Sequence, residues 1–278
     1  MFAAMGILLL VAVQSLGGPG NAIDTLHGVP GFMDWFPRDL ALPGAAGALL
    51  FAVSWLFAGL SVIGQPHVMV RFMALEDSGR MRRARTWYYL WFTGFYAMAT
   101  AVGMLSRIYL PEAGNFDAEL ALPNMALGLL PPVLVGLVLA GIFAATMSTA
   151  DSLILSCSAA ITHDLLPHRI ERPALLKLTT IAITGAALGL ALINSQSVFS
   201  LVIMAWSALA SAFAPLLLAL CLGRTPGERH SLVALVAGLG VALLWRYLGL
   251  HEAVYEGLPG IVTGLLVLLI PTKKFFAQ

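Results

Sequence analysis

The chain has 278 residues, of which 59% are hydrophobic and only 10% are charged, and its formal net charge is +1. So few charged side chains cannot coat a soluble globule of this size, and this balance excludes both nucleic-acid binding through a basic face and intrinsic disorder. Because the apolar residues come in blocks of roughly 20, the length that crosses a bilayer, the composition predicts a membrane protein.

Eight apolar segments follow one another along the chain and predict an all-α polytopic membrane protein with about eight transmembrane helices. The segments are residues 2–16, 45–75, 86–109, 132–163, 175–194, 198–222, 232–248 and 257–271. The one long connection, Gly17–Pro43, is rich in Gly and Pro and is expected to be a loop. Its Met33, Trp35 and Phe36 are expected to anchor it at the membrane interface.

Basic residues gather on one side of the membrane if the segments alternate across it. Twelve of the fifteen lie close to the cytoplasmic ends of the even-numbered segments or in the tail: Arg71, Arg80, Arg82, Arg83, Arg85, Arg169, Arg172, Lys177, Arg224, Arg229, Lys273 and Lys274. The other side holds Arg38, Arg107 and Arg246. Since cytoplasmic loops carry an excess of Lys and Arg, the C-terminus is predicted to be cytoplasmic in a cell (inner or plasma) membrane.

The second segment is too long for one simple crossing and contains the run AGLSVIGQPH in its middle. Pro66 removes a backbone donor, and Gly59 and Gly64 lower the cost of unwinding. Broken helices near the membrane midplane form substrate sites in many transporters. The alternative is an ordinary proline kink that only shapes packing.

The fourth segment carries a small residue at every fourth position from Gly136 to Ala160, a spacing that lets another helix approach closely. Its hydroxyls at Ser148 and Thr149, together with the carbonyl of Ala145 one turn earlier, could coordinate a hard cation such as Na⁺. The alternative is that these hydroxyls only bond to carbonyls of their own helix.

Asp151, in the same stretch, is the one carboxylate placed well inside a span, where an uncompensated charge costs several kcal/mol. It is expected to be a cation ligand, a proton carrier or a member of a buried ion pair, the last being the structural alternative. Trp206, inside the sixth segment, is either part of a gate or ligand wall or, more ordinarily, a core residue.

The sequence contains no HExxH, GxSxG or CxxC motif and no phosphate-binding loop, so neither an enzyme nor an organic cofactor is expected. Cys157 and Cys221 lie inside apolar segments and are expected to be buried free thiols.

Three stretches together resemble the solute:sodium symporter family, and in particular its sodium/proline symporter branch. They are GQPHVMVRFMA, FAATMSTADSLILSCSAAITHDL and SLVIMAWSALASAFAPLLLAL. The similarity runs in the same order from about Gly44 to the C-terminus. The resemblance implies a Na⁺-driven importer that works by alternating access, with a core of two inverted five-helix repeats and additional peripheral helices.

The resemblance also implies particular sites. The family's sodium site corresponds to Ala145, Ser148 and Thr149, and a second cation, held by some members, corresponds to Asp151 and Ser152. The substrate pathway would be lined by residues of the broken segment, with Trp206 near the outer gate. These pathway residues are Ala58, Gly59, Leu60, Ser61 and Gln65.

The family's first sodium-site helix is expected to precede residue 1, so the chain is expected to be the C-terminal part of a transporter whose N-terminal half is missing. Residues 1–43 would end a truncated helix and form an external loop, residues 44–222 would form the second repeat half, and residues 223–278 would be peripheral. The expected partners are Na⁺, a small substrate such as proline or a similar amino acid, and the lipid bilayer.

The substrate remains open at this point, because Ala58 and Val62 stand where the proline branch carries aromatic residues. The alternatives are a sodium- or proton-coupled symporter for pantothenate or another carboxylate, and a membrane fragment or sensory module that transports nothing.

Overall fold

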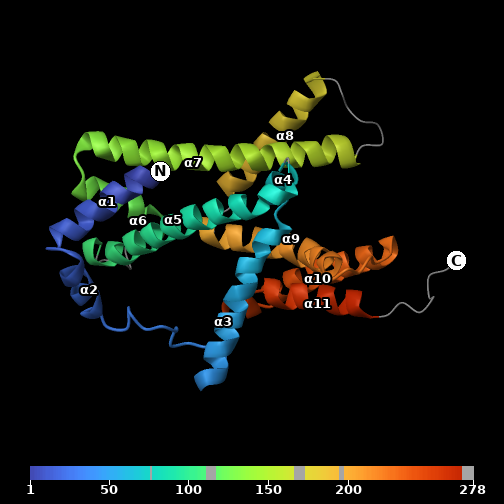
Figure 1. Ribbon diagram of the computed structural model, residues 1–278, viewed down its shortest axis with the longest axis horizontal. Helices are drawn as coiled ribbons and strands as arrows, with labels where there is room; N and C mark the ends of the chain where they lie inside the picture. Colours follow the sequence, from blue (N-terminus) through green and yellow to red (C-terminus); the bar gives the residue numbers. More distant parts are fainter. Residues whose placement is uncertain (76, 111–116, 166–172, 194–196, 271–278) are drawn as a thin grey trace. The chain divides into compact units, whose positions relative to one another are not determined.

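The computed structural model describes residues 1–75, 77–110, 117–165, 173–193 and 197–270 (Figure 1). Within these ranges every regular element is helical and no strand occurs, which confirms the predicted all-α fold. Such a fold suits a polytopic membrane protein, whose backbone polar groups must be satisfied internally.

Five helices in the described part of the chain are long and apolar enough to cross a membrane, or six if one bent pair counts as a span. The five are Gly44–Gly64, Pro132–Thr162, Pro173–Ile193, Val198–Cys221 and Glu228–Tyr247. This is fewer than the eight predicted. Helix α5 (Met81–Tyr109) is long enough, but its Tyr, Trp and Arg residues lower its mean hydropathy, and α11 (Gly257–Leu269) has only 13 residues.

The chain divides into two compact units, each made of two separate stretches. One unit contains Met1–Trp35 and Leu75–Ser195, and the other contains Phe36–Ala74 and Gln196–Gln278. The predicted sodium-site residues therefore belong to the first unit, and the predicted broken segment belongs to the second.

The first unit is built around α1 (Phe2–Ser15), which packs on α5 and on α7 (Pro132–Ala159). Leu8 and Ala12 of α1 are fully buried together with Met125 of α6 (Ala121–Leu129). α8 (Pro173–Ile193) also contacts α7, and a hydrogen bond of 3.2 Å joins the Ser158 and Thr180 hydroxyls.

The connection predicted as a loop contains a helix, α2 (Pro19–His27), bent by 77° from α1. Pro19 stands in its first turn, where the missing N–H costs nothing, and Ala22 and Leu26 are buried in the core of the first unit. The Gly and Pro content of this segment marked the two ends of the helix rather than a continuous loop.

The second unit contains α3 (Gly44–Leu60), α9 (Val198–Cys221), α10 (Glu228–Tyr247) and α11. Glycines let the last three helices approach closely. A Cβ built on Gly238 would lie 2.2 Å from the Ser211 carbonyl oxygen, and one built on Gly260 would lie 2.2 Å from the Ser211 hydroxyl. A side chain at either position would force the helices apart, because packed interiors leave no spare volume.

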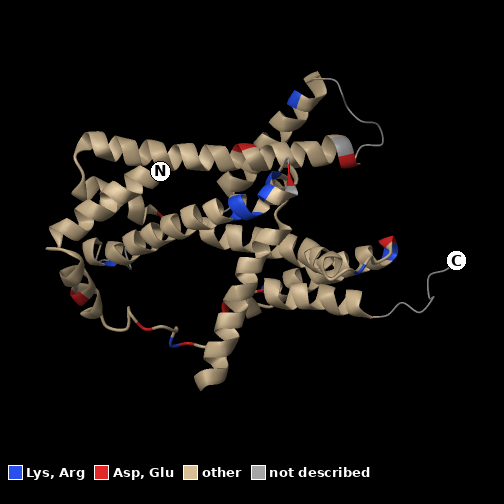
Figure 2. Ribbon diagram, viewed as in Figure 1, with Lys and Arg blue, Asp and Glu red and all other residues tan. Residues whose placement is uncertain are grey.

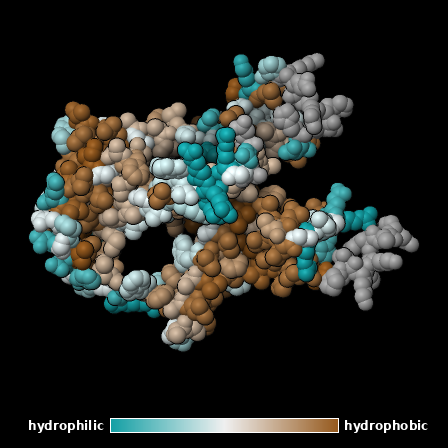
Figure 3. All heavy atoms as spheres, in the orientation of Figure 1, coloured by the Kyte–Doolittle hydropathy of each residue, from teal (hydrophilic) through white to brown (hydrophobic). Residues whose placement is uncertain are grey.

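Charged residues are concentrated at helix ends and in connections (Figure 2). α9 carries no charged residue, and α10 carries them only in its first and last turns. Hydrophobic residues cover much of the visible surface of the C-terminal helices (Figure 3). Such a surface suits a lipid environment.

Cys157 and Cys221 are both free, as predicted, but they are exposed rather than buried. Each lies in an apolar helix, Cys157 in α7 and Cys221 at the end of α9. The apolar surroundings of both residues in the sequence therefore did not predict burial in a packed protein core.

Candidate functional site

The second predicted segment is broken where its sequence indicated. α3 ends at Leu60, a 3₁₀ turn (η1) covers Ser61–Gly64, and α4 (Pro66–Met73) begins at Pro66 after Gln65 adopts an extended backbone (φ −91°, ψ 108°). Because Pro66 has no N–H to donate to Val62, the Val62 carbonyl accepts from the Gln65 N–H instead, at 3.2 Å. The break is thus a defined turn rather than a gentle kink.

The break is packed directly against the backbone of α9. A Cβ on Gly64 would lie 2.5 Å from the Cα of Ala210, so no side chain fits between the two segments. Ser61 is fully buried and Gln65 is 2% exposed. The Gln65 amide Nε2 donates to the Ser61 carbonyl at 3.4 Å and so partly replaces the interrupted helical bonding.

Tyr255, in the connection between α10 and α11, ties this connection to two points of the broken segment. Its hydroxyl lies 2.7 Å from the Ser61 hydroxyl, and its backbone N–H donates to the Ser54 hydroxyl at 2.8 Å. Ser61 directs its own hydroxyl proton to the Phe57 carbonyl at 3.1 Å, so the Tyr255 hydroxyl is the donor to Ser61. Burial raises the pKa of Tyr255 to about 12, which keeps this donor protonated at neutral pH.

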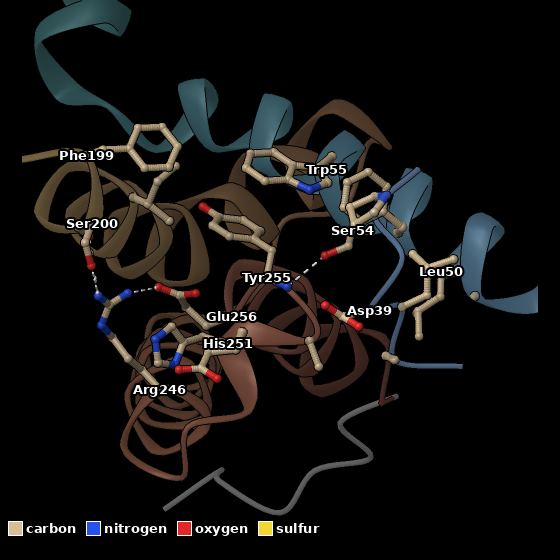
Figure 4. A pocket seen from close by; sticks show the side chains of 18 residues that line it. Asp39, Leu50, Ser54, Trp55, Phe199, Ser200, Arg246, His251, Tyr255 and Glu256 are labelled. Carbon is tan, nitrogen blue, oxygen red and sulfur yellow. Dashed lines mark hydrogen bonds and ion pairs between the residues drawn. The ribbon is translucent and has the colours of Figure 1, made fainter. Parts of the chain in front are cut away.

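The next residue, Glu256, forms a buried ion pair with Arg246 at the end of α10 (Figure 4). The two side chains are 2% and 16% exposed, and Arg246 Nη1 lies 2.8 Å from Glu256 Oε1. The same carboxylate oxygen accepts from the Ser207 hydroxyl at 3.1 Å, while Arg246 Nη2 donates to the Ser200 hydroxyl at 2.7 Å. The pair therefore joins α9, α10 and the start of α11.

A cavity of about 290 Å³ lies beside this ion pair, inside the second unit. Figure 4 shows Glu256 and Arg246 at one side of it, Trp55 and Ser54 of α3 at another, and Tyr255 between them. Its lining combines aromatic rings with charged groups, including Asp39 and Glu252. The cavity reaches the residues that hold the break, but its lining does not include Ser61, Gln65 or Trp206.

The predicted sodium-site residues lie on one exposed face of α7. The Thr149 hydroxyl donates to the Ala145 carbonyl at 3.1 Å, so helical geometry alone brings two of the three predicted ligands together. Ala145, Ser148 and Thr149 are all exposed. Three oxygens on one helix face cannot enclose a cation, and further oxygen ligands would have to come from another segment.

The predicted second cation site lies one turn further along α7. Asp151 is exposed, and no hydrogen bond or ion pair joins it to any residue that the structure describes. The Ser152 hydroxyl donates to the Ser148 carbonyl at 3.0 Å. The hydroxyl–carbonyl bonding that the sequence allowed as an alternative is thus present at both predicted cation sites.

The predicted pathway residues differ in their exposure. Ala58, Ser61 and Gln65 are buried, Leu60 is half-buried, and Gly59 is exposed with open space around it. Trp206 is half-buried on α9, next to the buried Ser207. Whether these residues line a substrate pathway stays a prediction.

The sequence did not indicate the roles of Tyr255, Glu256 and Arg246. Hydropathy placed Arg246 and Glu256 at the edges of two apolar segments, where charges usually face water. The available signal was that Arg246 and Glu256 are ten positions apart, on either side of one short connection. Such a connection returns the chain to the same end of two neighbouring helices.

These features define a class: an α-helical membrane protein with a broken span and a hydroxyl-rich face on another span, as ion-coupled transporters have. Residues 1–238 match the model of the Sodium:solute symporter family, and the chain belongs to that family.

Named relatives are bacterial proline carriers. The chain is 28% identical to the high-affinity proline transporter PutP of Bacillus subtilis over 96% of its length, and 29% identical to the osmoregulated proline transporter OpuE of the same organism over 99%. It is 29% identical to the sodium/proline symporter of Escherichia coli over 97% of its length. It spans only 57%, 57% and 55% of these three relatives.

Proposed function

We propose that this chain is part of a sodium-coupled symporter that imports proline or a similar amino acid by alternating access. The observation that carries the proposal is the combination of family membership with a broken span whose turn is held in a defined conformation against α9. The names of the relatives support proline as the first substrate to test. Na⁺ would be the coupling ion.

The arrangement in the membrane forms part of the same proposal. Residues 44–222 would supply the second inverted-repeat half, residues 223–278 the peripheral helices, and the C-terminus would be cytoplasmic. The further oxygens that a cation at the α7 site needs would come from a segment other than α7.

The proposal is tested by uptake of labelled proline into proteoliposomes that contain the protein encoded by the whole gene. An inward Na⁺ gradient is expected to drive accumulation, and an equal K⁺ gradient is expected to drive none. Competition by unlabelled amino acids and by pantothenate identifies the substrate class. Uptake that follows a proton gradient and ignores Na⁺ would contradict the proposed coupling ion.

Removing either hydroxyl of the proposed sodium site, by Ser148→Ala or Thr149→Ala, is expected to raise the Na⁺ concentration for half-maximal uptake. The loss of one cation–oxygen contact, taken as comparable to a charged hydrogen bond, corresponds to roughly 10- to 100-fold weaker binding. Thr146→Ala is the matched control, because Thr146 bonds to Phe143 one turn away on the same helix. An unchanged Na⁺ dependence in both site variants would contradict the assignment of these residues to a sodium site.

The Asp151→Asn variant separates a cation ligand or proton carrier from a structural role. If Asp151 binds a second cation, uptake by the variant is expected to depend less steeply on the Na⁺ concentration. The reason is that a neutral amide binds a cation less strongly than a carboxylate. If it carries a proton, the pH dependence of uptake is expected to change instead. Identical responses to both Na⁺ and pH would assign the residue a structural role.

A further inference from the structure

Besides its packing on α9, the broken span is held by two hydrogen bonds from one residue. Tyr255 donates its hydroxyl to Ser61 inside the 3₁₀ turn and its backbone N–H to Ser54 two helical turns earlier. It is separated from these residues by 194 and 201 positions in the sequence. A single residue, through its side chain and its backbone, thus joins the connection between α10 and α11 to two points of the segment that leads into the break.

Tyr255 is itself fixed in place. It is 7% exposed, and Gly257 leaves room for its ring, because a Cβ on Gly257 would lie 2.3 Å from Tyr255 Cε1. The neighbouring Glu256 is anchored by Arg246 and by Ser207 of α9. Any displacement of Tyr255 would therefore disturb a buried charge pair, which makes the residue a rigid support rather than an adaptable one.

We propose that Tyr255 is a positioning residue for the broken span. It holds the turn Ser61–Gly64 in its substrate-binding conformation, and the Glu256–Arg246 ion pair holds Tyr255 in place. The proposal rests on the proposed transport function. It adds a role for a connection outside the transmembrane helices, and it predicts that substrate affinity depends on a residue that does not touch the substrate.

Tyr255→Phe is the direct test, because it keeps the ring in the space beside Gly257 and removes only the donor to Ser61. Loss of one hydrogen bond is expected to speed backbone hydrogen exchange of residues 61–65 by roughly 2- to 12-fold, while exchange in α7 stays unchanged. The KM for proline is expected to rise by up to about 12-fold with an unchanged maximal rate, since fewer molecules hold the binding-competent turn.

Tyr247→Phe is the matched control, because Tyr247 ends α10 only eight positions away and is 87% exposed. Ser61→Ala, and the double variant with both Tyr255→Phe and Ser61→Ala, complete a double-mutant cycle. If Tyr255 acts through Ser61, the double variant is expected to exchange and transport no worse than Ser61→Ala alone. Fully additive effects would overturn the proposal, and so would unchanged exchange of residues 61–65 in Tyr255→Phe.

The transport function and the positioning role of Tyr255 can be contradicted independently of each other. Hydrogen exchange needs no transport, so it tests the positioning role even if Na⁺ drives no proline uptake. If the parent transports proline and Tyr255→Phe shows the parent's exchange and KM, the transport function stands and the positioning role is wrong. If Tyr255→Phe proves too unstable to purify, Ser54→Ala removes the second bond and is expected to speed exchange at the end of α3.

Discussion

Replacing Arg246 by Met is expected to lower the free energy of unfolding by about 3–5 kcal/mol, because it leaves the carboxylate of Glu256 buried without a positive partner. Glu256 is only 2% exposed, and its Oε1 accepts from both Arg246 and Ser207. The apolar stem of Met fills most of the space of the Arg side chain, so the loss reports the charge rather than a cavity. Equilibrium unfolding in mixed detergent micelles measures it.

Two further variants test whether this loss of stability comes from the unpaired buried charge of Glu256. Arg229→Met, in the first turn of the same helix, removes an exposed charge and is expected to change the free energy of unfolding by less than about 0.5 kcal/mol. Arg246→Met combined with Glu256→Leu removes both charges and is expected to recover most of the loss. Equal stability of Arg246→Met and Arg229→Met would show that the pair is not a buried one.

The second large effect is expected from Gly64→Ala in the broken span. The new Cβ would lie 2.5 Å from the Cα and 2.7 Å from the backbone N of Ala210, and neither helix backbone can move aside cheaply. Overpacking of this kind costs about 1–3 kcal/mol or more. Because the strain falls on the turn itself, uptake of proline is expected to fall by roughly tenfold or more, as measured in proteoliposomes.

Gly59→Ala provides the comparison on the same segment, because no atom lies within 4 Å of the position where its Cβ would be. Alanine in the last turn of α3 is expected to leave stability unchanged or slightly raised. Reduced uptake with unchanged stability in this variant would support the predicted place of Gly59 in the substrate pathway. Parent-like stability and uptake in Gly64→Ala would contradict the close packing of the turn on α9.

The break in the second segment could be predicted because its causes are local. Pro66 lacks a backbone donor, and Gly64 has no side chain, whatever their surroundings are. The same holds for the face that Ala145, Ser148 and Thr149 share on α7, since residues three and four apart lie together on any helix. α2 and the exposure of Cys157 were not predicted correctly, because they depend on how segments pack and not on their own composition.

The support for the break could not be predicted, because its parts are far apart in the sequence. Tyr255 and Ser61 are 194 residues apart, and nothing in either local sequence indicates the other. In the sequence, Arg246 and Glu256 stand at the ends of apolar segments, where charges usually face water. Only the close approach of α9, α10 and α11 through Gly238 and Gly260 removes these two charges from water.

The sequence by itself determined that this protein is an all-helical membrane protein, where its second segment breaks, and which hydroxyls of α7 share a face. These properties follow from hydropathy, backbone chemistry and helical periodicity, which act over a few residues. Only the tertiary structure decided that Gly64 rests on Ala210, that Tyr255 holds Ser61, and that Arg246 and Glu256 form a buried pair. Such contacts arise from packing between distant segments, because close packing selects partners by shape and by the loss of water.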